Sequence, residues 1–271
     1  MRATVVVDNI GTQDLRSEWG LCIYIEYGGK KILLDTGASA LFAENADKLR
    51  LPLAEVDFAV LSHAHYDHAN GMEEFFRRNA AAKFYLSACC AENCYSRKWR
   101  VFRRYVGLPR GVLARYGDRI VLADGPCSPA EGVHLLPHDG PIPEAVGKRD
   151  GLYAKRKGRM RPDDFTHEQS LVFEAEDGLV IFNSCSHGGA DRIVREAQSA
   201  FPDRRVLALI GGFHLHNKSE REVCELAARL RETGAEQIVT GHCTGEKAYR
   251  LLRRELGERV RQMHAGMVME F

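Results

Sequence analysis

Histidines and an aspartate crowd into one short stretch of the chain, and their spacing suits metal chemistry. Four metal-type ligands fall within six positions: His63, His65, Asp67 and His68. The apolar run at residues 56–61 just before them predicts a buried strand. Alternate side chains of extended backbone share a face, so His63 and His65 can bind one cation, while the adjacent Asp67 and His68 diverge and suit a second. Imidazole and carboxylate together favour zinc, iron or manganese over calcium or magnesium.

Three further histidines follow strand-like segments in the second half. Each lies in a turn that contains glycine: His187 after residues 179–183, His214 after residues 204–210 and His242 after residues 237–240. One histidine at a strand end is more often a hydrogen-bonding residue than a ligand. Four such strand ends in one chain, with glycines that let the backbone crowd a common point, predict that the histidines converge.

The elements that must position these residues are strands followed by helices. In the first half we expect strands at residues 4–8, 20–27, 31–35 and 83–87, with helices at 38–49 and 72–79. In the second half Asp177-Gly178 indicates a hairpin between strands 170–176 and 179–183, and helices are expected at 190–200, 219–232 and 246–256. Two such halves packed face to face predict the α/β class, as a four-layer αββα sandwich that holds a dinuclear metal site.

Length and composition limit the possible domain organisation, localisation and partners. The chain has 271 residues, 45% of them hydrophobic, and we expect a single domain over residues 1–271 with a basic insertion at about 95–165 near the active site. No signal peptide or membrane-spanning run is visible, which predicts a cytoplasmic protein with no membrane partner. The eight cysteines contain no CxxC pair, so free thiols are expected. A net charge of +1 argues against nucleic acid as a partner, and the oligomeric state is left open, a homodimer included.

The basic insertion is the place to look for substrate contacts. Arginines and lysines dominate residues 96–119 and 148–161, with aromatic residues between them. A solvated surface is the ordinary interpretation of such runs. The alternative is a pocket for an anionic, aromatic small molecule, bound by guanidinium and ammonium groups, and its candidates are Arg97, Arg100, Arg104 and Lys155. Residues 137–150 are expected to be irregular, with His138 as a structural or surface residue.

Residues 63–68 resemble the H-x-H-x-D-H signature of the metallo-β-lactamase superfamily, and Leu34-Asp35-Thr36-Gly37 resembles its earlier aspartate motif. The later SCSHGG, GGFHL and GHCTG turns resemble more narrowly a dihydropteroate-synthase-like subgroup. An archaeal member of that subgroup is proposed to join a dihydropterin to an aminobenzene ribofuranosyl phosphate. The resemblance spans essentially the whole chain.

The resemblance implies two divalent metal ions, zinc first, with iron and manganese as alternatives. His63 and His65 would hold the first ion and Asp67 and His68 the second. His187 and His242 would be the distal ligands. Asp35 is either a cap or a residue that orients a ligand.

Two positions depart from the pattern of the superfamily. Cys185 stands where many members have a bridging aspartate, which leaves open a single tightly bound metal or a site tuned by a thiolate. His167 precedes Glu168 where an aspartate is expected, and could be a ligand or a loop residue.

The resulting expectation is hydrolysis of a small anionic, phosphorylated substrate by a metal-bound hydroxide. Asp67 would orient the water and take its proton. His214 would be a general acid or a substrate hydrogen-bond donor, with a ligand role as the alternative. The competing functions are a transferase that condenses a pterin with an aminobenzene phosphate, a di-iron redox or sensing protein, and a binding module without catalysis.

Overall fold

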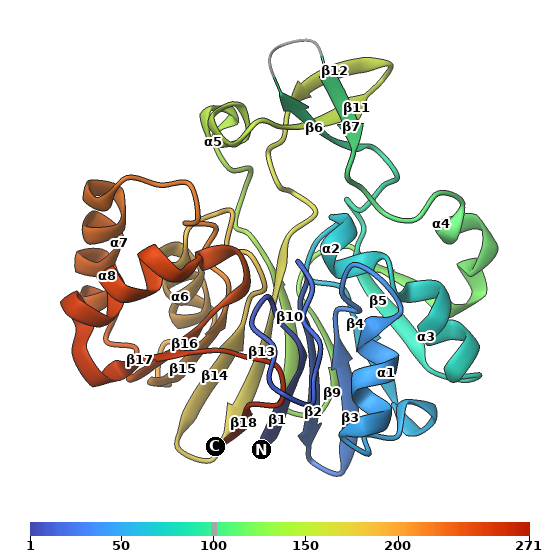
Figure 1. Cartoon of the computed structure of the whole chain (residues 1–271), viewed down its shortest axis with the longest axis horizontal. Coiled ribbons are helices and arrows are strands. Elements are labelled where there is room, and N and C mark those ends of the chain that lie inside the picture. The colour runs from blue at the N-terminus through green and yellow to red at the C-terminus, as the bar shows by residue number, and fades with distance from the viewer. Residues whose placement is uncertain (99–101) are drawn as a thin grey trace.

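Two seven-stranded sheets form the middle of the molecule (Figure 1). The computed structural model describes residues 1–98 and 102–271. The first sheet has the order β18-β1-β2-β3-β4-β5-β8, with strands at Val268–Glu270, Arg2–Val7, Cys22–Tyr27, Lys30–Leu34, Phe58–Val60, Lys83–Ser87 and Ile120–Ala123. The second has the order β17-β16-β15-β14-β13-β10-β9, with strands at Val260–Gln262, Gln237–Thr240, Val206–Gly211, Gly178–Phe182, Gln169–Ala175, Val133–Pro137 and Cys127–Ala130.

Helices cover the outer face of each sheet. The first sheet packs against α1 and α3, at Leu41–Lys48 and Met72–Arg78, and the second against α6, α7 and α8, at Ala190–Ala200, Glu220–Thr233 and Glu246–Leu256. The short helices are α2, α4 and α5, at Tyr66–Ala69, Val112–Arg115 and Glu144–Asp150, and 3-10 turns lie at Leu53–Glu55, Gly117–Arg119, His242–Thr244 and Gly257–Arg259.

Three separate apolar layers prove the order of the sandwich. Successive residues of β2 alternate between layers, since Tyr24 packs under the helices of the first sheet while Ile23 and Ile25 pack between the sheets. Phe173 and Phe182 of the second sheet enter the same central layer. A third layer joins the second sheet to α6, α7 and α8. The predicted αββα fold is therefore confirmed.

Strand direction brings the important turns to one rim. In the first sheet β3, β4 and β5 are parallel, and β1 runs the same way because it is antiparallel to β2, which is antiparallel to β3. In the second sheet β14, β15 and β16 are parallel. The residues that follow these strands therefore collect at the carboxyl edges, where sheet enzymes place their chemistry.

A small third sheet lies over this rim, at the top of Figure 1. Its order is β12-β11-β6-β7, with strands at Arg159–Pro162, Leu152–Arg156, Cys94–Lys98 and Phe102–Tyr105. The prediction of an irregular segment at residues 137–150 was wrong in part, because α5 occupies its end and stops at Gly151, whose φ is 68°. Within the described residues, none of the helices is both long and apolar enough to cross a bilayer.

Candidate metal centre

The histidine turns converge at the rim. The ring of His63 lies 4.2 Å from that of His68 and 5.1 Å from that of His187, between ring centres. His65 lies 4.6 Å from His63, and His242 lies 4.9 Å from His68. All five side chains are buried. Residues from positions 63 to 242 thus share one small volume.

Asp35 orients two of these rings. Its carboxylate accepts hydrogen bonds from the Ser62 backbone N–H and hydroxyl, both at 2.8 Å, and from Nδ1 of His68 at 2.7 Å. Since the Ser62 hydroxyl donates to Asp35, it accepts from Nδ1 of His63 at 2.9 Å. Both rings therefore carry their proton on Nδ1 and present a bare Nε2. Asp35 has the environment of a residue that orients ligands.

The turn after β1 fixes His242 in the same way. Nδ1 of His242 donates to the side-chain oxygen of Asn9 at 3.0 Å, and its backbone N–H donates to Asp8 at 2.8 Å. A Cβ at Gly241 would lie 2.9 Å from that Asp8 oxygen, so only glycine allows the approach. Sequence reasoning missed Asp8 and Asn9, although Asp8 is the last residue of the strand predicted at residues 4–8 and Asn9 follows it.

Asp163 and His167 support His65. Nε2 of His65 lies 3.9 Å from the Asp163 carboxylate and has no hydrogen-bond partner among the described residues. Nδ1 of His167 accepts the Ala64 N–H at 3.2 Å, and its Nε2 lies 3.2 Å from Asp163. Both nitrogens of His167 are thus engaged, which favours an orienting role over ligation. Cys94 completes this buried group, with its sulfur 3.8 Å from His167.

The ligand atoms form two groups that share one sulfur. The first group holds His63 and His187, and the ring centre of His65 lies 4.6 and 5.0 Å from theirs. The second group holds His68 and His242, and Oδ2 of Asp67 lies 3.8 and 3.5 Å from their Nε2 atoms. The Cys185 sulfur lies within 4.8 Å of a nitrogen of His63 and of His187. It also lies within 4.8 Å of a nitrogen of His68 and of His242. Nε2 of His63, Nε2 of His242 and both nitrogens of His187 are buried without a hydrogen-bond partner among the described residues. Buried nitrogens without partners are costly, and cations would satisfy them.

The protonation states of the histidines and of Asp67 favour the binding of a cation. Burial lowers the pKa of His63 and of His187, and the neighbouring imidazoles lower it further, so both rings are neutral ligands at neutral pH. Burial would raise the pKa of Asp67, but His68 and His242 hold it well below its usual range. Its Oδ2 lies 3.5 Å from Nε2 of His242 and 3.8 Å from Nε2 of His68. The second group therefore keeps a carboxylate charge.

The turns that carry the candidate ligands also contain residues with strained backbone angles. Asp35, Ser186, His214 and His242 have φ between 46° and 59°, in the left-handed region that residues other than glycine seldom adopt. Each lies in a turn that follows one of the strands described above. Such strain persists where the surrounding structure enforces it, and it clusters at functional sites.

His214 meets a buried ion pair that the sequence did not suggest. Its Nε2 lies 3.8 Å from Asp150, at the end of α5, and the ammonium of Lys218 bonds to the same carboxylate. Its ring centre lies 4.5 Å from that of His187, and Nδ1 has no hydrogen-bond partner among the described residues. Asp150 and Lys218 were hidden from sequence reasoning because both lie in segments rich in charge.

Glu168 holds the turn that carries His187. Its carboxylate accepts the backbone N–H groups of His187 at 3.0 Å and of Gly188 at 3.1 Å. His138 lies between Glu168 and Glu196, at 2.7 and 2.8 Å, and these carboxylates raise its pKa to about 9 against the effect of burial. The expectation that His138 is a structural residue agrees with this buried bridge.

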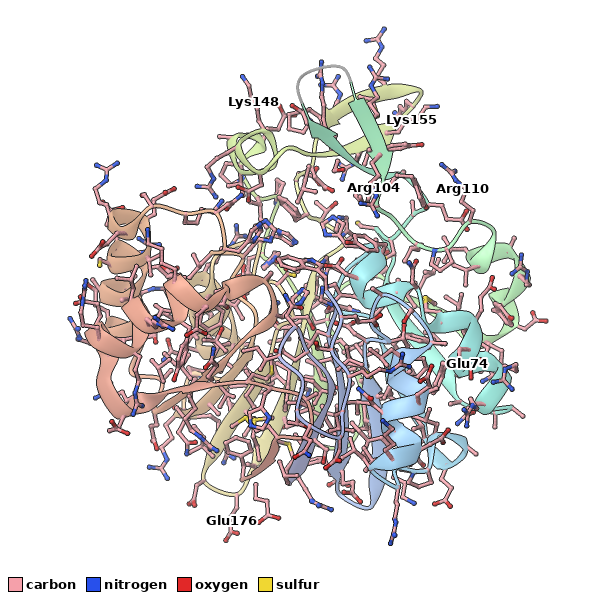
Figure 2. The ribbon with its side chains drawn as sticks, viewed as in Figure 1. Glu74, Arg104, Arg110, Lys148, Lys155 and Glu176 are labelled. Atoms are coloured by element: carbon pink, nitrogen blue, oxygen red, sulfur yellow. The ribbon has the colours of Figure 1, made fainter. Side chains whose placement is uncertain are left out.

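A cleft of about 280 Å³ opens beside the ligand groups. Its walls include Trp19, His65, Asp67, Arg104, Cys185 and Cys243. The guanidinium of Arg104 lies over the ring of Tyr66, 5.4 Å from its centre. Figure 2 shows Arg104 at the underside of the small sheet and Lys148 and Lys155 projecting outward from that part of the molecule.

The four basic residues predicted to bind substrate differ in their position relative to this cleft. Arg104 lines the cleft. Lys155 is exposed, and Arg97 lies over the ring of Tyr153, 5.7 Å from its centre. Neither is among the residues that line this cleft. Arg100 lies outside the described residues. All eight cysteines are described and all are free thiols, as expected.

Sequence comparisons agree with these observations. The profile of the metallo-β-lactamase superfamily matches residues 20–199. The enzyme 7,8-dihydropterin-6-methyl-4-(β-D-ribofuranosyl)-aminobenzene-5'-phosphate synthase of Methanocaldococcus jannaschii is 28% identical over 269 residues, which cover 94% of this chain and 90% of the enzyme.

Solved structures show the same architecture. The crystal structure of Tm1679, described as a metal-dependent hydrolase of the β-lactamase superfamily, superimposes with a TM-score of 0.85 at 28% identity, over 100% of this chain and 99% of that one. Zinc-bound PqqB of Methylobacterium extorquens gives a TM-score of 0.60 at 10% identity, over 100% of both chains, and this likeness concerns the fold alone.

Proposed function

Because the chain belongs to the metallo-β-lactamase superfamily, we propose that it is a metal-dependent hydrolase of a small anionic, phosphorylated substrate. The observation that carries the proposal is the set of buried imidazole nitrogens without partners around the Cys185 sulfur. No ordinary packing role explains why nitrogens on three separate turns should face one another without donors.

The two ligand groups would hold two divalent cations, with zinc as the first choice. His63, His65 and His187 offer neutral nitrogens, and Asp67 adds a carboxylate to the nitrogens of His68 and His242. Cys185 would supply the shared ligand in place of an aspartate. Bound at such groups, zinc acidifies water and polarises the group under attack.

Three residues of the chain would orient the water, donate a proton to the leaving group and bind the anionic group of the substrate. Asp67 is held deprotonated beside His68 and His242, so its oxygens can accept a hydrogen bond from water and orient it. His214 has Nε2 directed to Asp150, so its Nδ1 is the atom left to donate to the leaving group when the ring is protonated. Arg104 is the cation placed to bind an anionic group in the cleft.

Asp67→Asn tests the proposal. The variant keeps the shape of the side chain but loses its charge, and we expect turnover of a phosphate ester by the zinc-loaded protein to fall by about 10²–10⁴-fold with an unchanged circular dichroism spectrum. Asp203→Asn, an exposed carboxylate on the surface, is the matched control. Near-normal turnover by the Asp67 variant would rule out this role.

A condensing transferase is the second candidate, and the name of the Methanocaldococcus jannaschii relative favours it. The cleft offers the indole of Trp19 for a planar ring and Arg104 for a phosphate. Incubation in ¹⁸O-labelled water separates the two functions. Hydrolysis places the label in a product, whereas condensation of a pterin pyrophosphate with an aminobenzoate-type amine incorporates none.

A further inference from the structure

Two thiols lie side by side at the metal centre. The sulfurs of Cys185 and Cys243 are 3.4 Å apart. Cys185 follows β14 and Cys243 follows β16, two strands separated in the sheet by β15. Neither residue is paired by a CxxC spacing, so only the fold reveals the pair.

The turn after β15 brings the two sulfurs together. A Cβ at Gly212 would lie 2.5 Å from the Cys243 sulfur and 2.7 Å from the Ser184 carbonyl, so the absence of a side chain there lets the turns touch. The backbone N–H of His214 donates to the Cys243 sulfur at 3.2 Å.

Both cysteines line the cleft beside the ligand groups. Cys185 and Cys243 are among its lining residues, whereas the other buried cysteines, Cys22, Cys90 and Cys94, are not. A small reagent that enters the cleft would therefore lie near these two thiols.

We propose that Cys185 and Cys243 are a modification site, at which a small hydroperoxide forms a reversible disulfide that is incompatible with a bound metal. This rests on the proposed metal centre, because Cys185 is the sulfur shared by both ligand groups. A disulfide sulfur has no thiolate charge to offer a cation. Oxidation would therefore release the metal, and a bound metal would protect the thiols.

The chemistry balances without a further reactant. The Cys243 sulfur attacks the hydroperoxide: an S–O bond forms, the O–O bond breaks, and an alkoxide, or hydroxide from hydrogen peroxide, leaves and takes up the proton that the Cys243 thiol released to solvent, which makes Cys243 a sulfenic acid. The Cys185 sulfur then attacks the Cys243 sulfur: an S–S bond forms, the S–O bond breaks, and water leaves with the thiol proton. Two thiols lose two electrons, and the peroxide gains them.

The sulfurs must close from 3.4 Å to the S–S bond length of about 2 Å. A thiol would restore the pair by exchange.

The test begins with metal-free protein treated with hydrogen peroxide, followed by alkylation and peptide mapping. We expect the free thiols to fall from eight to six, with a peptide that links Cys185 to Cys243, and dithiothreitol to restore all eight. Cys224→Ser, a half-buried cysteine of α7, should still lose two thiols, and Cys243→Ser should lose none of the remaining seven to a disulfide. Irreversible sulfinic acid at Cys185 or Cys243, or linkage only among Cys89, Cys90 and Cys94, would overturn the proposal.

Zinc-loaded protein provides the second arm. We expect a slower loss of thiols, and release of zinc to a chromophoric chelator in step with disulfide formation. An equal rate in both forms would overturn the exclusion of metal by the disulfide. Failure of the protein to bind zinc at all would instead refute the proposed function, and the mapping of the metal-free protein would still decide whether the thiol pair forms.

Discussion

Replacing Asp35 by asparagine is expected to weaken metal binding although Asp35 touches no cation in the proposed site. The side chain is fully buried and accepts three hydrogen bonds, two from Ser62 and one from His68. Asparagine has nearly the same shape, so the change removes charge and acceptor capacity with little loss of volume. One carboxylate oxygen becomes an NH₂ group, which cannot accept from Nδ1 of His68.

The magnitude follows from what Asp35 does for two ligands. It fixes the tautomer of His68 directly and that of His63 through the Ser62 hydroxyl. Loss of such support costs about 10–100-fold in metal affinity, or about 1.4–2.7 kcal/mol. We expect the upper half of this range, because two of the six nitrogen and oxygen ligands depend on one carboxylate.

Competition with a chromophoric chelator measures the affinity of the variant for zinc. Asp47→Asn is the control, since Asp47 is an exposed carboxylate of α1 that pairs with Arg78 on the surface. Thermal unfolding of the metal-free proteins shows whether Asp35→Asn is folded. A folded Asp35 variant with the affinity of the wild type would refute the assignment of Asp35 as the residue that orients His63 and His68.

Three further outcomes are expected. Arg104→Gln should raise KM for an anionic substrate about tenfold with a small change in kcat, in steady-state kinetics, because a cation of the cleft is lost; an unchanged KM would exclude it from binding. The unfolding free energy, from denaturant titration, should fall by up to about 3 kcal/mol as pH rises from about 6.5 through about 9. The reason is that the raised pKa of His138 stabilises the fold only while the ring is protonated, so this contribution to the fall should be missing in His138→Gln. Gly212→Ala should lower the melting temperature, since its Cβ would lie 2.5 Å from the Cys243 sulfur, at a cost of about 1–3 kcal/mol; an unchanged melting temperature would contradict the close approach of the turns.

Regular elements were predictable where apolar periodicity was strong. The strands at residues 83–87 and 237–240 and the helices at 190–200 and 246–256 have the predicted bounds. The small sheet was not predicted, because its strands lie in runs of arginine and lysine that hide any alternation. In β12 the exposed Arg159 and Arg161 do alternate with the half-buried Met160 and Pro162, but the strand has only four residues.

The candidate site was predictable to the extent that its residue types are rare. Histidines at strand ends stand out, and the structure brings His63, His187 and His242 together. Apart from Asp35, residues that act through other residues did not stand out. Asp163 and Asp150 are acidic residues in charged segments, and only their contacts with His65 and His214 reveal them. Nothing in the sequence distinguishes Cys243 from the other cysteines, and only the fold shows that its sulfur lies beside that of Cys185.

Anomalous diffraction from crystals of the zinc-loaded protein tests the central claim most directly. We expect two peaks, one among His63, His65 and His187 and one among Asp67, His68 and His242, with the Cys185 sulfur between them. A protein that crystallises from excess zinc without a peak at these residues, or with metal only at the group of Cys94, Asp163 and His167, would contradict the account.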